Sequence, residues 1–212
     1  MKNIKDELRN IIVGDGSVSE TSQLKKTQNF LRRYAQTGFR AKKQKYLKSE
    51  EEIRLIDFAI KENLIYSNEI SEDEFISAGA EQRVYRYDDC NVVKLNDSVF
   101  YEHWLDYFNS LLIHNYFFQA TAYNFLGFKL INEKLFAVVK QEFIIANELT
   151  NLTSVKKFLL FNNFVNNRNH DYINKDFRII FEDLHDENVL SNNGIVYFID
   201  TIFYLQDNFY EG

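Results

Sequence analysis

The chain has 212 residues, a formal net charge of −6 and 45% apolar residues, including 20 Phe and 13 Tyr. This composition can build the core of one moderate domain, or of a small domain with an appendage, and it excludes a disordered chain. The single cysteine, Cys90, excludes an internal disulfide, and the sequence has neither the apolar leader of a signal peptide nor a run long enough to cross a membrane. We therefore expect a cytoplasmic protein without a membrane partner.

Positive charge is concentrated in residues 21–49, which contain no acidic residue. Such a block can contact nucleic acid or an acidic partner. It can equally face solvent or the acidic remainder of its own protein, and the sequence leaves both interpretations open. The cations of this basic segment are Lys25, Lys26, Arg32, Arg33, Arg40, Lys42, Lys43, Lys45 and Lys48.

Residues 1–70 have the pattern of a small helical appendage. Helical spacing of apolar residues predicts helices over 3–13 and from Ser22 to Gln36. Ser49 followed by Glu52 is a capping-box pattern, in which each side chain bonds to the backbone amide of the other residue. The helix that this box opens has an apolar stripe, which we expect to face the core: Ile53, Ile56, Ile60 and Leu64.

From Asp73 onwards, short apolar runs replace the helical spacing. We predict three strands, over residues 74–77, 81–87 and 92–95, separated by turns of small and polar residues. The third strand contains Lys94 within an apolar run. A charged side chain in such a place is costly unless it has a partner, so Lys94 is a candidate functional residue.

The following residues contain patterns of both helix and strand. A long aromatic-rich helix is predicted over 99–120, a hairpin over 128–144 and a further helix over 151–164. Residues 166–175 are polar and are expected to form a loop.

Three polar groups able to bind a metal or move a proton lie close together near the end of the chain. Asp183 and Asn188 are five residues apart, which lets them converge on one point of a loop. The apolar run Ile195–Ile199 then brings Asp200 to the same end of a sheet. Oxygen ligands of this kind suit Mg²⁺. A simple hairpin turn also uses Asp, Asn and Gly, so the segment alone leaves both interpretations open.

The whole order of elements resembles the protein-kinase-like phosphotransferases, in particular their aminoglycoside and choline kinase branch. Asp183-Leu184-His185-Asp186-Glu187-Asn188 matches the D-L-H-x-x-N part of the catalytic loop of that branch, and Val92-Val93-Lys94 matches the V-A-I-K motif. The chain is also similar to kinase-like domains in polyvalent proteins of bacterial mobile elements and phages. The resemblance covers about residues 73–205.

The resemblance implies ATP and Mg²⁺ as cofactors and assigns a role to each matching residue. Asp183 would be the catalytic base, while Asn188 and Asp200 would hold Mg²⁺. Lys94 would bind the α- and β-phosphates and so take part in catalysis.

The resemblance also places the nucleotide. Residues 77–84 align with the glycine-rich loop, so Ser77 and Gly79 would lie beside the phosphates. Glu142 to Ile144 would form the hinge that hydrogen-bonds adenine.

The chain departs from the family pattern at several points. Phe181 replaces the His that usually precedes the catalytic Asp, and only the middle glycine of the loop, Gly79, is kept. The acid that pairs with Lys94 is either Glu102 or Asp106. Because the chain stops a dozen residues after Asp200, we expect a truncated, minimal kinase.

The implied fold is α+β, with a helical appendage (1–70), an antiparallel-sheet N-lobe containing one long helix (73–145) and a truncated helical C-lobe (146–212). The implied function is a Mg·ATP-dependent phosphotransferase that acts on a hydroxyl of a small molecule or protein. The alternative is a pseudokinase or nucleotide-binding adaptor, which binds a protein or nucleic acid without phosphoryl transfer.

Overall fold

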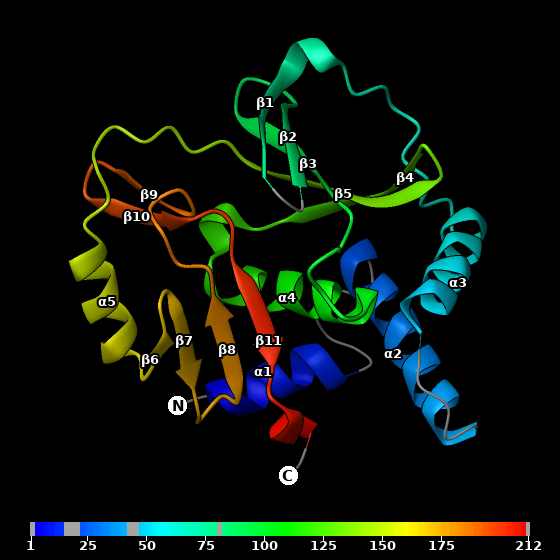
Figure 1. Ribbon diagram of the computed structural model, residues 1–212, viewed down its shortest axis with the longest axis horizontal. Helices are drawn as coiled ribbons and strands as arrows, with labels where there is room; N and C mark the ends of the chain where they lie inside the picture. Colours follow the sequence, from blue (N-terminus) through cyan, green and yellow to red (C-terminus); the bar gives the residue numbers. More distant parts are fainter. Residues whose placement is uncertain (1–2, 15–21, 42–46, 80–81, 211–212) are drawn as a thin grey trace. The chain divides into compact units, whose positions relative to one another are not determined.

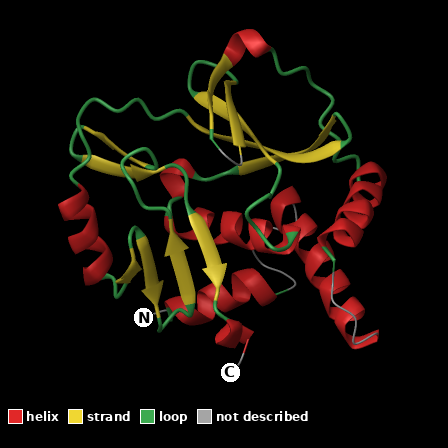
Figure 2. Ribbon diagram, viewed as in Figure 1, coloured by secondary structure: helices red, strands yellow, loops and turns green. Residues whose placement is uncertain are grey.

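The structure is a computed structural model, and it describes residues 3–14, 22–41, 47–79 and 82–210. Helices and antiparallel sheets form the predicted α+β fold (Figures 1 and 2). The chain divides into two compact units. Unit 1 consists of Met1–Asp15, Asn109–Ala122 and Ile144–Gly212, and unit 2 consists of Gly16–Phe108 and Tyr123–Phe143. No helix in the described ranges has both the length and the apolar character needed to cross a bilayer.

Unit 2 contains a five-stranded antiparallel sheet in the order β1-β2-β3-β5-β4, which confirms the predicted strands and hairpin. The most apolar strand, β3, is central and is buried from Val92 to Asn96. A short 3₁₀ helix, η1 (Glu72–Glu74), precedes the sheet. The strands are β1 (Phe75–Ala78), β2 (Gln82–Arg86), β3 (Asn91–Asn96), β4 (Asn124–Ile131) and β5 (Lys134–Glu142).

Much of the described basic segment contacts its own protein. It forms helix α2 (Gln23–Ala41), in which Lys25 and Arg32 are buried. The Lys26 ammonium lies 2.5 Å from the Glu62 carboxylate, at the end of the next helix. These contacts favour the intramolecular interpretation for this part of the segment. Four residues lie outside the described residues or have no described side chain: Arg40, Lys42, Lys43 and Lys45.

Helix α3 (Lys48–Lys61) buries a different face from the one that its apolar stripe predicts. Ile53 and Ile60 are 63% and 60% exposed, whereas Glu51 is fully buried together with Leu55 and Ala59. The capping box is also wrong, because the helix begins after Leu47, without a side-chain cap.

Helix α3 buries this face because it holds the start of helix α4 (Trp104–Phe117). The Glu51 carboxylate accepts hydrogen bonds from the backbone N–H groups of Trp104 (2.7 Å) and Leu105 (3.1 Å). The Lys48 ammonium donates to the carbonyl of Tyr101 (2.9 Å). Free N–H groups at a helix start need acceptors, and a buried carboxylate needs donors, so these contacts turn the polar face of α3 inwards. The boundary between the units falls within α4, after Phe108.

Unit 1 contains a four-stranded sheet in the order β11-β8-β7-β6 and a β9–β10 hairpin. The predicted helical C-lobe is therefore wrong, because residues from 146 onwards form one α-helix, one 3₁₀ helix and six strands. The strands are β6 (Val165–Arg168), β7 (Asp171–Asn174), β8 (Ile179–Glu182), β9 (Val189–Asn192), β10 (Ile195–Phe198) and β11 (Ile202–Leu205). The helices are α1 (Ile4–Val13), α5 (Leu152–Phe161), η2 (Gln119–Thr121) and η3 (Asp207–Tyr210), with the second half of α4.

The polar stretch 166–175 was predicted to be a loop because Asn and Asp favour turns. In the structure it forms most of the β6–β7 hairpin, whose turn uses Asn169 at a φ of 46°. Buried side chains of Tyr172 and Asn174 point to one side of β7 and hold it against the sheet. Tertiary packing thus overrides the local turn preference of this stretch.

The core of unit 1 is aromatic. The rings of Phe181 on β8 and Phe203 on β11 stack at 4.3 Å between centroids, and those of Phe118 and Phe198 stack at 4.4 Å. Phe118 follows α4 directly, so this cluster joins the end of that helix to the strands on both sides of residues 183–200.

Candidate active site

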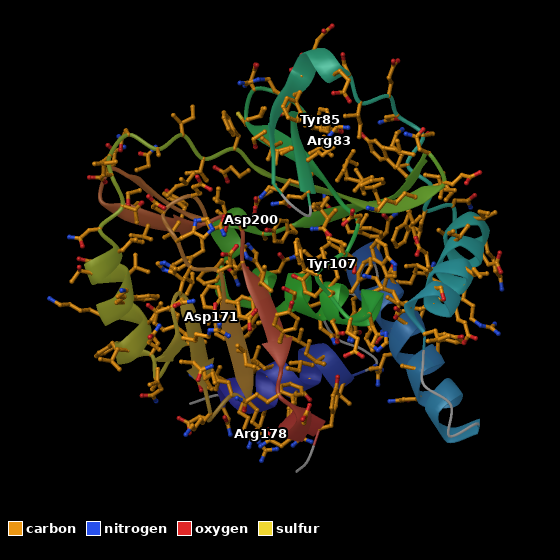
Figure 3. All side chains as sticks on the ribbon, in the orientation of Figure 1. Arg83, Tyr85, Tyr107, Asp171, Arg178 and Asp200 are labelled. Atoms are coloured by element: carbon orange, nitrogen blue, oxygen red, sulfur yellow. The ribbon has the colours of Figure 1, made fainter. Side chains whose placement is uncertain are left out.

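Two strand pairs of unit 1 bring Asp183, Asn188 and Asp200 to one place. Glu182 pairs with Ile202 at the end of β8 and β11, so Asp183 leaves the sheet where the chain arrives from Asp200. The β9–β10 hairpin ends with Val189 opposite Phe198, and the Ile199 N–H donates to the Asn188 carbonyl at 3.0 Å. Figure 3 shows Asp200 just ahead of β11. The structure therefore brings together the three residues that the sequence singled out.

Hydrogen bonds within the loop connect Asp183 to Asn188. The Asn188 side-chain amide donates to the Asp183 carboxylate and to its backbone carbonyl, both at 2.9 Å. Both bonds use the nitrogen of the amide, and its oxygen, Oδ1, takes no part in them. A metal ion would bind this oxygen, because only the oxygen of an amide has lone pairs to offer.

His185 contacts the other oxygen of the Asp183 carboxylate, at 3.2 Å from Nε2. The Nδ1 atom accepts a hydrogen bond from the Glu187 N–H at 3.3 Å, and Nε2 also lies 3.1 Å from the side-chain nitrogen of Asn188. Asp183 itself has a φ of 63°, an uncommon conformation that Asp tolerates better than most residues. The carboxylate thus contacts two side chains of its own loop, Asn188 and His185.

Asp171 also contacts this loop, although the sequence did not indicate it as a site residue. It lies at the start of β7 (Figure 3). Its carboxylate accepts a hydrogen bond from the Asp183 N–H at 3.3 Å. Burial, together with the charges of Asp171 and Asp183, raises the pKa of the neighbouring Glu182 carboxyl. Local sequence carried no signal for this contact, because it depends on the β6–β7 hairpin.

In unit 2, Lys94 lies in the middle of the central strand β3, between Val84 of β2 and Val139 of β5. Its side chain is 3% exposed, and the ammonium is 5.6 Å from the centre of the Tyr123 ring. A ring face attracts a cation at this distance. The structure therefore provides a buried lysine on the strand where the sequence predicts it.

The two candidate acids for Lys94 lie in different surroundings within unit 2. Glu102 is exposed beside His103 at 3.9 Å. Asp106 accepts a hydrogen bond from the His103 N–H at 3.2 Å, and burial raises the pKa of its carboxyl. The pairing of either acid with Lys94 stays a prediction.

The described glycine-loop residues lie at the end of β1, where Ser77 is part of the strand and Gly79 follows it, and at the start of β2. Ser77 and Gly79 are exposed, and the Gly79 N–H donates to the Gln82 carbonyl at 2.9 Å. A methyl group built on Gly79 would meet no atom within 4 Å, so packing does not require glycine there. Residues Ala80 and Glu81 of this loop lie outside the described residues.

The predicted hinge is the point where the chain passes from unit 2 to unit 1, between Phe143 and Ile144. Glu142 is the exposed last residue of β5, and the Phe143 N–H donates to the Cys90 carbonyl at 2.8 Å. Among the residues that the structure describes, none accepts a hydrogen bond from the Ile144 N–H. The adenine-binding role of residues 142–144 stays a prediction.

A comparison with protein families matches residues 48–207 to the serine/threonine/tyrosine kinases found in polyvalent proteins. The matched range begins at the first residue of α3 and includes Lys94, Asp183, Asn188 and Asp200. The chain belongs to this kinase family. No curated protein matches the chain, and no solved structure does. The predicted similarity to the aminoglycoside and choline kinase branch stays a prediction.

In this member of the family, Phe181 stands where the resemblance leads us to expect the catalytic-loop His, and its side chain packs in the core. Phe181 is 1% exposed, and its ring stacks on Phe203, three residues beyond Asp200. Its strand also pairs with β11 at the same point. An apolar contact therefore connects the two halves of the site where a polar residue is usual.

Proposed function

We propose that the protein binds Mg·ATP and transfers the γ-phosphoryl group to a hydroxyl acceptor. The observation that carries this proposal is the convergence of Asp183, Asn188 and Asp200 at the ends of two strand pairs, within a chain of the kinase family. Phosphoryl transfer needs positioning and charge neutralisation more than covalent chemistry, and these residue types can supply both.

The residues present fit a magnesium ion bound together with a nucleotide. Mg²⁺ usually takes one or two carboxylates and completes its shell with phosphate oxygens and water. Asp200 would supply a carboxylate, and Asn188 the Oδ1 atom that its bonds to Asp183 leave unused. Among the described residues, no three His, Cys, Asp or Glu side chains form a group that could hold a metal. The site therefore suits a metal that arrives with its nucleotide.

The remaining residues have defined tasks in this proposal. Asp183, oriented by His185 and Asn188, would accept the proton of the acceptor hydroxyl. The Lys94 ammonium would bind the α- and β-phosphates, with Ser77 and Gly79 beside them. The backbone at Glu142 to Ile144 would hydrogen-bond adenine. When bound, Mg²⁺ neutralises the charge that develops on the phosphate oxygens.

Calorimetry with Mg·ATP tests the proposal. We expect Asp200→Asn and Lys94→Met each to weaken binding by about 10-fold or more, because each removes a charge that faces the phosphates. Asp207→Asn and Lys140→Met are matched controls, since they remove the same charges from residues outside the proposed site. Wild-type protein that does not bind Mg·ATP, or binding that is indifferent to both site variants, would contradict the proposal.

A second candidate function is nucleotide binding without phosphoryl transfer. The observation in its favour is that both oxygens of the Asp183 carboxylate already contact side chains of the loop, at 2.9 and 3.2 Å. Each carboxylate oxygen has two lone pairs, so an acceptor hydroxyl would have to share an oxygen with one of these side chains. Incubation with ATP labelled at the γ-phosphate distinguishes the two functions, because only the enzyme releases or transfers the label.

A further inference from the structure

Three buried hydrogen bonds surround Asp200 in unit 1. The Thr121 hydroxyl donates to the Phe198 carbonyl at 2.6 Å, two residues before Asp200. The Thr201 hydroxyl lies 2.7 Å from Nδ1 of His114, and the Phe203 N–H donates to the Ser110 hydroxyl at 2.9 Å. We call Ser110, His114 and Thr121 the polar clamp. It comes from the second half of α4 and from η2, far from residues 198–203 in sequence.

The geometry of the clamp indicates which tautomer His114 adopts. Its Nε2 atom lies 2.8 Å from the backbone carbonyl of Thr121, which can only accept a hydrogen bond. Nε2 therefore carries the proton of the neutral ring. Nδ1 is then an acceptor, and it takes the hydrogen bond of the Thr201 hydroxyl. One ring thus connects Thr121 to the residue that follows Asp200.

Burial makes these contacts costly to lose. His114 is 0% exposed, Ser110 and Thr121 are each 1% exposed, and Thr201 is 6% exposed. A buried polar group that loses its partner is destabilising, so the clamp favours one position of residues 198–203 over other positions. The surrounding aromatic core already buries Phe198 and Phe203. The polar groups therefore add a defined position for residues 198–203 and not further burial.

Hydrogen bonds hold the chain on both sides of Asp200. Phe198 is bound by Thr121, and Ile199 donates its N–H to the Asn188 carbonyl. On the other side, Thr201 and Phe203 are bound by His114 and Ser110. Only Asp200 itself lies between Ile199 and Thr201, so its backbone has little freedom to move away from Asn188.

We infer that the polar clamp positions Asp200 for metal binding, mainly through the hydrogen bond between His114 and Thr201. This inference rests on the proposed function, in which Asp200 and Asn188 hold Mg²⁺. Residues that orient a metal ligand typically change metal affinity or activity by about 10- to 100-fold when they are altered. Ser110, His114 and Thr121 touch neither nucleotide nor metal in this account, so they are positioning residues.

The test compares Thr201→Val, which keeps the volume but removes the hydroxyl, with Thr201→Ser, which keeps the hydroxyl. ATP affinity is measured by calorimetry with Mg²⁺ and again with EDTA in place of the metal. Amide hydrogen exchange over residues 198–203 is measured without nucleotide. Ser110→Ala, which removes the acceptor for Phe203, serves as a second variant, and thermal unfolding checks that each variant is folded.

We expect Thr201→Val to increase exchange over residues 198–203 and to weaken ATP binding about 10-fold in Mg²⁺. Binding in EDTA should not change, and Thr201→Ser should behave as the wild type. A purely structural role would instead weaken binding equally with and without metal, and that result overturns the inference. Amide hydrogen exchange over residues 198–203 that is unchanged in both Thr201→Val and Ser110→Ala also overturns the inference.

Failure of the proposed function gives a different result. Wild-type protein that binds no ATP in Mg²⁺ overturns the function and the metal role of the clamp together. Wild-type protein that binds Mg·ATP, with Thr201→Val binding equally well in Mg²⁺, overturns only the clamp. The exchange measurement needs no nucleotide, so it reports on the hydrogen bonds in either case.

Discussion

At the scale of single residues, two glycines differ in whether packing requires them. Gly127 in β4 has a φ of 136°, and a methyl group built on it would lie 2.4 Å from the Leu64 carbonyl oxygen. This backbone conformation and this close approach both require glycine. Gly79, in the predicted phosphate loop, has open space around it. Packing within the described residues therefore does not require glycine at this position. Its place beside the phosphates stays a prediction.

Alanine at each position tests this difference. We expect Gly127→Ala to lower the free energy of unfolding by about 1–3 kcal/mol, because it adds strain and a clash with backbone atoms. Gly79→Ala should stay within about 0.5 kcal/mol of the wild type. Urea unfolding followed by circular dichroism measures both. Equal losses in the two variants would contradict this account of Gly127.

At the scale of elements, α3 supplies a cap that α4 lacks in its own sequence. Glu51 of α3 is fully buried and accepts hydrogen bonds from the first two N–H groups of α4. Its negative charge also suits the positive end of the helix dipole. Burial lowers the pKa of the nearby Lys48 ammonium, which shows that this contact region is shielded from water. The two helices therefore depend on each other.

Removal of the cap should weaken unit 2. We expect Glu51→Ala to lower the free energy of unfolding by about 1–2 kcal/mol, in the range measured for helix caps. Glu51→Gln keeps one acceptor oxygen and should lose less. Glu50→Ala is the matched control, since Glu50 lies in the same helical turn but is exposed. Thermal unfolding that ranks Glu50→Ala with Glu51→Ala would argue against a capping role.

At the scale of the whole molecule, each unit is assembled from stretches that are far apart in sequence. The core of unit 1 includes Phe117 and Phe118, at and after the end of α4, which contact Phe203 and Phe198 near the end of the chain. Helix α1 joins the same unit, where the Tyr116 hydroxyl donates to the Glu7 carboxylate at 2.6 Å. The predicted domain bounds of 1–70, 73–145 and 146–212 follow sequence order and stay a prediction.

A fragment of residues 146–212 tests how far that division holds. The fragment lacks the aromatic side chains of residues 117 and 118 and the polar clamp, so we expect it not to fold. Circular dichroism should show little sheet signal and no cooperative thermal transition. The complete chain serves as the folded control, and a cooperative transition in the fragment alone would show that this segment is an independent domain.

The sequence by itself determined the strands of the five-stranded sheet, the position of Lys94 on β3 and the kinase family. These features depend on short-range patterns and on the D-L-H-x-x-N motif, which is contiguous in the chain. Tertiary structure decided the rest. The hairpin of residues 165–174 forms because Tyr172 and Asn174 are buried in the sheet. The contact of Asp171 with Asp183, the buried face of α3 and the clamp around Asp200 all join residues that are distant in sequence. Local preference says nothing about such partners, because the partner, and not the residue itself, decides whether a polar side chain can be buried.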